Sequence, residues 1–325
     1  MTMKRFISGL IPFLFLIAFC ACSNNGKIIE AYDRGDFNTV KELCNPRADK
    51  DDPKCLYLLG RMFTEGNGVV INDENALKYL SKAADLGHHY AQYYLGSSLL
   101  QGVFKGKSTD EAMDYIHKAA KAGLPEAQFL YYSAKKTFER LSEENKISDE
   151  EEKEINLFLE KSADKGNVDS LMTLAVRYCV PVSTQPECET KGIPMMEKAA
   201  ESSLVNPLRS LGLLRYSRQE FDKSVEPLKQ AAMQGDGEAA FFLGRIYIAG
   251  RGNEDGYKWM KVAAESGNEM ALEQLKSFSN PNLRDVLIEG EKRYEQVAKS
   301  IRYNKMIEQR RATERNIGKE FLDKF

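Results

Sequence analysis

The sequence predicts an all-α fold, a right-handed α-solenoid of helix–turn–helix repeats followed by a C-terminal capping helix. Two observations predict it. A phrase of paired small residues recurs along the 325-residue chain, and a leucine-containing or aromatic phrase follows each copy at a constant distance of 12 residues. A short self-similar period of this kind is typical of repeat proteins, whose units stack on their neighbours.

The spacing of the two phrases divides each repeat into two helices. The first small residue falls at positions 83, 119, 162, 199, 231 and 263, and Leu95-Gly96 is an example of the phrase 12 residues later. The distance from that phrase to the next small residues varies between 20 and 31 residues. A constant distance indicates two helices packed in one register, and a variable one indicates a surface loop. Each unit is therefore predicted to be helix A, a loop, helix B and a tight turn.

The recurring phrases resemble the Sel1-like repeat, a relative of the tetratricopeptide repeat. Leu59-Gly60 with Gly66-Asn67-Gly68-Val69, and then Tyr79 with Lys82-Ala83-Ala84, fits that pattern almost throughout. Residues 31–37 resemble a tetratricopeptide-type hairpin. The resemblance covers residues 27–280. It implies a solenoid whose A helices line a concave face that binds protein partners.

Residues 1–21 predict a targeting signal. Lys4 and Arg5 precede an uncharged apolar run at 6–19 that is too short to span a bilayer comfortably. Ala21-Cys22-Ser23 resembles the cleavage box of bacterial lipoproteins, which implies acylation of Cys22 and a tether over residues 22–26. Ser23 in place of a retention aspartate implies the outer membrane, facing the periplasm. The alternative is an ordinary secretory signal cut elsewhere.

The charge balance indicates no nucleic-acid partner. Lys and Arg number 46 against 48 Asp and Glu, which gives a net charge of −2. Loss of residues 1–21 removes Lys4 and Arg5 and no acidic residue, so the charge becomes −4. The acidic stretch Ser142–Glu154 falls in the loop of the third unit. We expect a solvated loop there, with recruitment of a basic partner as the alternative.

Four cysteines besides Cys22 remain after residue 21, in two pairs that are close in sequence. An exported chain meets an oxidising compartment, and four cysteines allow three pairings. We expect the local pairings, Cys44 with Cys55 and Cys179 with Cys188. Zinc binding is the alternative, although neither pair has CxxC spacing.

After Pro281 the repeat pattern ends. Residues 283–325 contain 11 Lys and Arg against 8 Asp and Glu and no proline. The segment 281–325 is predicted to be a charged helical cap over the end of the array, which repeat proteins need. A partner-binding or membrane-surface helix is the alternative.

The sequence offers little for catalysis. His88, His89 and His117 have no HExxH-type partner, and no G-x-S-x-G or phosphate-binding glycine loop occurs in a suitable context. We expect these histidines to be surface or packing residues, and we expect no cofactor and no metal. Because some cysteine-rich relatives of the family are linked to β-lactam hydrolysis, a β-lactam or cell-wall enzyme stays open as an alternative.

The candidate binding site is a row of side chains on the A helices, two residues before or after the leucine-containing phrase. Aromatic and arginine side chains are common anchors of protein interfaces. The alternative is that these rings pack between neighbouring A helices. The row consists of Tyr57, Arg61, Tyr93, Phe129, Met172, Arg209, Phe241 and Arg245.

These features predict a non-catalytic, lipid-anchored periplasmic solenoid that acts as a scaffold or an inhibitor of a protein partner. The membrane contact is through the lipid on Cys22, and the oligomeric state stays open. Two narrower roles follow from the resemblance. One is an immunity protein that neutralises a secreted antibacterial phospholipase, and the other is a lipoprotein of an exopolysaccharide or secretion assembly.

Overall fold

The computed structural model describes residues 25–104, 108–141, 146–180, 186–250 and 253–277. The predicted signal peptide, Cys22 and the segment 281–325 lie outside the described residues, so their roles stay predictions. Every regular element within the described ranges is a helix, which confirms the predicted all-α class.

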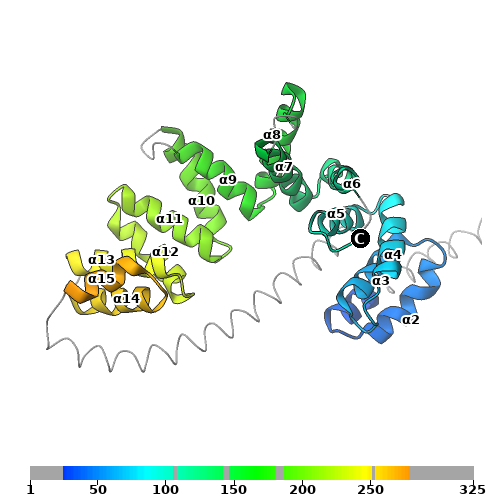
Figure 1. Cartoon of the computed structure of the whole chain (residues 1–325), viewed down its shortest axis with the longest axis horizontal. Coiled ribbons are helices and arrows are strands. Elements are labelled where there is room, and N and C mark those ends of the chain that lie inside the picture. Colours follow the sequence, from blue (N-terminus) through cyan, green and yellow to red (C-terminus); the bar gives the residue numbers. More distant parts are fainter. Residues whose placement is uncertain (1–24, 105–107, 142–145, 181–185, 251–252, 278–325) are drawn as a thin grey trace, which may run out of the picture. The chain divides into compact units, whose positions relative to one another are not determined.

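The chain divides into two compact units, with the boundary between Tyr131 and Tyr132 (Figure 1). In the first unit, helical residues 25–33 precede α2 (Phe37–Ala48), α3 (Pro53–Glu65), α4 (Asp73–Asp85), α5 (His89–Leu100) and α6 (Thr109–Lys121). Helix α7 (Pro125–Leu141) contains the boundary. The second unit continues with α8 (Asp149–Asp164), α9 (Val168–Cys179), the π-helical turn η2 (Cys188–Gly192), α10 (Ile193–Ala200), α11 (Val205–Ser217), α12 (Phe221–Met233), α13 (Gly237–Gly250), α14 (Asn253–Glu265) and α15 (Glu269–Ser277).

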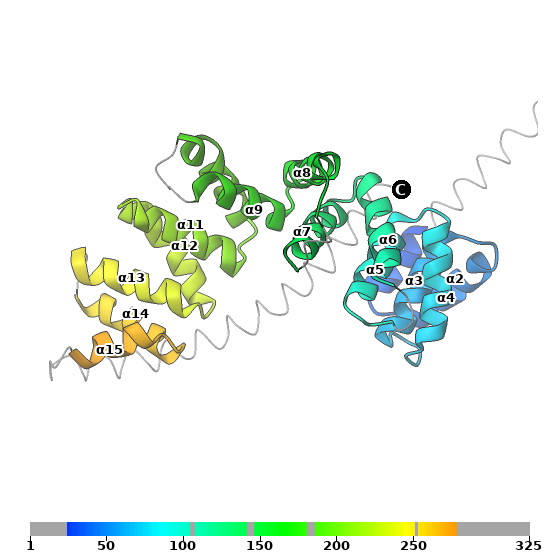
Figure 2. The ribbon, with the colours of Figure 1, turned by 45° about the horizontal axis from the view of Figure 1, so that its top comes forward.

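Within each unit, a helix A makes its most extensive contacts with the helix B that follows it. The pairs α3–α4 and α5–α6 show this in the first unit, and α11–α12 and α13–α14 show it in the second (Figure 2). Each helix B then contacts the next helix A, as α4 does with α5 and α12 with α13. These contacts between sequence neighbours are the stacking that the repeat spacing predicts.

Glycines lie where helix A crosses helix B. A methyl group added at Gly60 would lie 2.7 Å from the Leu80 side chain. The same addition at Gly96 would lie 2.8 Å from the carbonyl oxygen of Ala112, and at Gly212 it would lie 2.6 Å from Leu228. These distances are too short for a real side chain, so the glycine of the Leu-Gly phrase is what lets the two backbones approach.

The turn from helix B to the next helix A also depends on glycine. Gly87, Gly123, Gly166, Gly235 and Gly267 all have φ between 83° and 94°. In this left-handed region an L-residue is strained, whereas glycine is not. The amides of these glycines donate to carbonyls of the preceding helix, as in a left-handed C-cap. The tight turn predicted after helix B is therefore a left-handed cap at these five positions.

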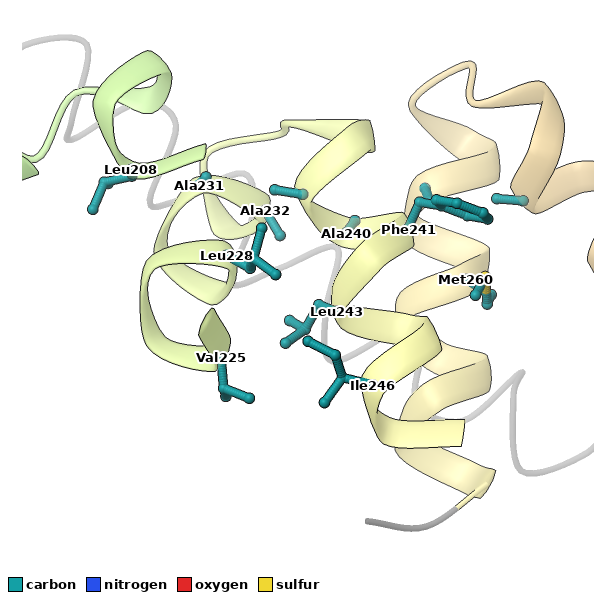
Figure 3. Packing of buried hydrophobic residues seen from close by; sticks show 13 residues of the cluster. Leu208, Val225, Leu228, Ala231, Ala232, Ala240, Phe241, Leu243, Ile246 and Met260 are labelled. Atoms are coloured by element: carbon teal, nitrogen blue, oxygen red, sulfur yellow. The ribbon is translucent and has the colours of Figure 1, made fainter. Parts of the chain in front are cut away.

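Alanines and leucines fill the space between successive hairpins. Figure 3 shows Val225 and Leu228 of α12 on the side that faces Leu243 and Ile246 of α13. Ala231 and Ala232, the small-residue phrase of this repeat, are fully buried in the same cluster. The small residues leave room for the larger side chains of the adjacent helices, which explains why the phrase recurs.

The structure contains both local disulfides. Cys44 in α2 is bonded to Cys55 in α3, and Cys179 at the end of α9 is bonded to Cys188 at the start of η2. All four cysteines are buried. The predicted pairing is confirmed, and each bridge joins segments of a single hairpin or turn.

The expected acidic loop of the third unit is partly wrong. Asp149–Glu152 form the first turn of α8, and Ser148 caps that helix with Glu151 in a capping box. Acidic side chains are favoured at a helix N-terminus because they face its positive dipole end. Glu151 and Glu152 also pair with Lys135 and Lys136 of α7, at 3.0 and 2.5 Å. The capping box and the ion pairs with α7 therefore make the end of this acidic stretch helical, although its high charge suggested a solvated loop.

A histidine caps one of the A helices. The Nδ1 atom of His88 accepts a hydrogen bond from the amide of Ala91 at 3.1 Å, and the ring packs on Tyr57 with centroids 5.0 Å apart. Burial, with the nearby charges of His89 and Lys54, lowers the pKa of His88 to about 4. The residue is 9% exposed. Capping requires the neutral imidazole, because a protonated Nδ1 cannot accept a hydrogen bond.

We predict that Gly96→Ala destabilises the chain by about 1–3 kcal/mol, because the added methyl group must displace the α6 backbone. Urea unfolding followed by circular dichroism measures the change. Gly26→Ala is the matched control, because a methyl group there meets nothing within 4 Å. Equal stability of the two variants would contradict the role assigned to the crossing.

We also predict an acid-sensitive cap. The folded pKa of His88 lies below its ordinary value of 6.5, so its contribution is complete above pH 6.5 and is lost as the pH falls towards about 4. The slope is up to about 1.4 kcal/mol per pH unit. His88→Asn is the control, because Asn167 and Asn268 cap A helices at the same repeat position without titrating. Parallel stability curves for the two proteins between pH 7 and 4 would refute the prediction.

Candidate functional site

The structure gives the predicted row of A-helix side chains several different environments. Tyr57 and Phe241 are each 5% exposed, so these two rings pack in the array as the alternative expected. Tyr93, Phe129, Met172, Arg61 and Arg209 are half-buried, and Arg245 is exposed. A surface role is therefore open to part of the row, and its use as a binding face stays a prediction.

In the first unit, two residues of the row, Tyr57 and Arg61, belong to a cluster of side chains that contact one another. We call it the Arg61 cluster, and it consists of Tyr32, Tyr57, Arg61, Glu65 and Tyr94. The guanidinium carbon lies 5.3, 5.9 and 5.5 Å from the ring centres of Tyr32, Tyr57 and Tyr94. Its Nη2 and Nε atoms lie 2.7 and 2.8 Å from one oxygen of Glu65, one helical turn later. The Arg61 side chain is only 18% exposed.

Glu65 is the acceptor at the centre of the Arg61 cluster. The hydroxyls of Tyr32 and Tyr94 donate to its two oxygens at 3.3 and 3.2 Å, and the Asn67 amide donates at 2.7 Å. Burial, together with the Glu65 charge, raises the pKa of Tyr94 to about 12, so this hydroxyl keeps its proton as a donor. The positive charge of Arg61 and the negative charge of Glu65 are therefore paired with each other inside the cluster.

The surroundings of Arg61 keep it charged. Burial by itself would lower the pKa of the guanidinium, but Tyr57, Tyr32 and Glu65 together raise the pKa above its ordinary value. Cation–π contact and a charge-assisted ion pair both favour the charged form. The Arg61 cluster is therefore an ionic contact between helix α3 and its neighbours. The shifted pKa values keep Arg61 charged and the tyrosine hydroxyls protonated, so they do not create a nucleophile or a general base.

In the second unit the row contains a more open cluster, the Arg245 cluster: Tyr216, Phe221, Phe241, Phe242 and Arg245. The Arg245 guanidinium carbon lies 5.8 Å from the Tyr216 ring centre and 5.9 Å from that of Phe241. Tyr216 meets Phe221 and Phe242 edge to face at 5.4 and 4.8 Å. Phe221 is 45% exposed, and Tyr216 and Phe242 are half-buried.

The other arginines near this part of the second unit are paired inside the chain. Arg209 lies 2.9 Å from Asp236 and 3.6 Å from Glu238. Arg215 is buried and pairs with Glu197 of α10 at 2.6 Å and with Glu220 at 2.5 Å. Their charges are used to join helices, so they offer less to a partner than Arg245 does.

Sequence reasoning missed six of the ten residues in the two clusters. The residues outside the predicted row are Tyr32, Glu65, Tyr94, Tyr216, Phe221 and Phe242. One signal could have found some of them, because Tyr32 and Phe37 are five residues apart just as Tyr216 and Phe221 are. The buried position of Arg215 had no such signal.

The described residues contain no group of three His, Cys, Asp or Glu side chains placed to hold a metal ion. Over the same ranges, no helix combines the length and the apolar character needed to cross a membrane. Both statements concern only the part of the chain that the structure describes.

Known proteins share this architecture. A protective antigen of uropathogenic Escherichia coli has a similar structure, with a TM-score of 0.63 at 20% identity over 91% of this chain and 67% of the antigen. A Sel1 repeat protein from Oxalobacter formigenes gives a TM-score of 0.59 at 21% identity over 74% of this chain and 99% of that one. At these identities the likeness shows the fold.

Sequence relatives match over shorter stretches. The alginate biosynthesis protein AlgK of Pseudomonas syringae pv. tomato is 33% identical over 95 residues, which is 29% of this chain and 20% of AlgK. The chain spans between about a fifth and about a half of the length of the curated relatives it matches.

The family model of the Sel1 repeat matches residues 53–88, 89–124 and 237–268. These segments are α3–α4, α5–α6 and α13–α14, each a helix A with its helix B and the turn that follows. The hairpins, their glycine crossings and the structural neighbours agree with the matched segments, and the chain contains Sel1 repeats at these three places.

Proposed function

We propose that this chain is a non-catalytic protein-binding scaffold, attached to the outer membrane by a lipid on Cys22 and facing the periplasm. Sel1-repeat proteins in general bind protein partners. The observation that carries the proposal is the Arg245 cluster, where an exposed arginine lies beside half-buried and exposed aromatic rings. Arginine and aromatic side chains are the usual anchors of protein interfaces.

The disulfides support the proposed compartment. Both bridges are local and buried, and disulfides persist in oxidising compartments such as the periplasm. The lipoprotein-like box at Cys22 supplies the proposed anchor. A single acyl chain binds membranes weakly, so the multiple acylation of bacterial lipoproteins gives a firmer attachment.

A second candidate follows from one relative. The name of AlgK places that protein in alginate biosynthesis, and the match lies in 95 residues of this chain. We therefore keep a scaffold of exopolysaccharide assembly as the narrower alternative. It differs from the general proposal only in the identity of the captured partner.

The anchor makes a direct prediction. The wild-type chain, expressed in a bacterium with radiolabelled palmitate, should incorporate label and sediment with outer-membrane fractions, and Cys22→Ser should do neither. The control is the wild type with the lipoprotein signal peptidase inhibited, which should accumulate as a larger precursor. Unlabelled wild-type protein in the soluble fraction would overturn the anchor while leaving the binding surface open.

The binding surface is tested by photo-crosslinking in living cells. A benzophenone amino acid should give a discrete crosslinked band at Tyr93 of α5, which is on the predicted row. The same result is expected at the exposed Val176 of α9, two residues after the phrase Leu174-Ala175. The same amino acid at the exposed Lys198 and Lys229 of helices α10 and α12 is the matched control. Equal bands from both sets, or no band from any position, would count against the proposal.

The captured partner separates the narrower roles. A component of a polysaccharide synthesis or export complex, identified by mass spectrometry, would favour the exopolysaccharide candidate. A secreted phospholipase would favour the immunity alternative.

A further inference from the structure

The Arg61 and Arg245 clusters are two copies of one arrangement. Tyr32, Phe37, Tyr57 and Arg61 in the first unit correspond to Tyr216, Phe221, Phe241 and Arg245 in the second. The spacings along the chain are identical, with 29 residues from the tyrosine to the arginine in each case. Both copies lie on a helix A and on the helix–turn–helix that precedes it.

The geometry of the two copies agrees closely. The tyrosine and phenylalanine meet edge to face at 5.6 Å in the first copy and 5.4 Å in the second. The guanidinium carbon lies 5.3 and 5.8 Å from the tyrosine ring centre, and 5.9 Å from the second ring in both.

The turns also match. Gly35 and Gln219 hold the same left-handed position, with φ of 74° and 61°. The amide after each of them, at Asp36 and at Glu220, donates to the carbonyl of the residue five earlier, at 2.8 and 2.9 Å. The two arginines are therefore presented by the same local backbone.

The copies differ in the group that faces the arginine. In the first, Glu65 lies four residues after Arg61 and binds it through Nη2 and Nε. The residue four after Arg245 is Ala249, which is exposed and carries no acceptor. Within the described residues, no carboxylate oxygen lies within ion-pair distance of Arg245. The second copy keeps the cation and its aromatic setting without the carboxylate.

We propose that Arg245 binds a carboxylate of the protein partner, the side chain of a Glu or Asp flanked by apolar residues. The partner's carboxylate takes the place that Glu65 has beside Arg61. Its apolar neighbours pack on Phe221 and Phe242. This inference rests on the proposed protein-binding function, and it states the chemistry of the segment that the second unit recognises.

The setting favours a carboxylate flanked by apolar side chains. The planar guanidinium matches a carboxylate in a bidentate pair, and the rings hold it in a fixed orientation. The described cluster presents one cation beside apolar rings, which complements a single negative charge with hydrophobic flanks. The Arg61 cluster shows that this backbone accommodates a glutamate carboxylate at the arginine.

Nuclear magnetic resonance of the arginine Nε–Hε groups in the full mature chain tests the proposal. The probes are acetyl-Leu-Glu-Leu-amide and its neutral match acetyl-Leu-Gln-Leu-amide, and Arg245→Gln assigns the resonance. We expect saturable shifts of the Arg245 signal with the Glu peptide, with a Kd on the order of 1 mM. Loss of a charge-assisted hydrogen bond should make the Gln peptide bind about tenfold or more weakly.

Two variants of one exposed position complete the test. Ala249→Glu supplies the missing carboxylate from within the chain, so the Arg245 signal should be shifted before any peptide is added and peptide affinity should fall at least about tenfold. Ala249→Gln has the same size without the charge and should bind as the wild type does. Neither change touches the buried core.

Equal affinity for the Glu and Gln peptides, or an unaffected Ala249→Glu protein, would overturn the proposal. So would an Arg245 signal already shifted in the free wild-type chain, because the chain's own carboxylate would then occupy the site. Crosslinks from Tyr93 and Val176 together with equal peptide affinities would leave the scaffold function standing and remove only the carboxylate. Selective binding of the Glu peptide without specific crosslinks would support the carboxylate site at Arg245 and count against the scaffold function.

Discussion

The close crossing of helix A and helix B is the constraint on which the rest of the structure depends. At Gly60, Gly96 and Gly212 a side chain would collide with the partner helix, so the backbones meet at a distance that only glycine allows. This contact sets the angle of these three hairpins. The buried alanines then set how the next hairpin stacks. Because both contacts involve neighbours in sequence, the same geometry recurs without any long-range pairing.

A backbone that recurs can carry different side chains to equivalent places. The turn-cap position holds His88, Asn167, Asp236 and Asn268 in different copies, and the hydrogen bond to the helix amide is kept each time. The same logic applies to the Arg61 and Arg245 clusters. The backbone is common to all copies, so it does not distinguish one copy from another. The copies differ in whether a side chain finds its partner within the chain, and we expect a copy without such a partner to bind another molecule.

Much of the fold was predictable because its signals are local. The 12-residue spacing predicted the tight turn between helix B and the next helix A, and the structure shows a left-handed glycine there, at Gly87 and Gly267 for example. The cysteine spacing predicted both bridges. The acidic stretch was misread, because charge density alone does not reveal that Ser148 and Glu151 form a capping box.

The candidate site was less predictable. Position in the repeat placed Tyr57 and Arg245 on the same row, yet one is buried and the other exposed. Exposure depends on the neighbouring helices, and Tyr32 and Tyr94 reach Arg61 from outside its own hairpin. A pattern along one helix contains no information about such contacts until the repeats are compared with one another.

The short span of the two disulfides has a consequence for the order of folding. Their cysteines are 11 and 9 residues apart, so each bridge can close once a single short segment is free to move. A chain with mainly local contacts also folds without waiting for distant segments. Under the proposed export of this chain, the two bridged segments can each fold and oxidise separately, with little opportunity for cysteines of different repeats to mispair.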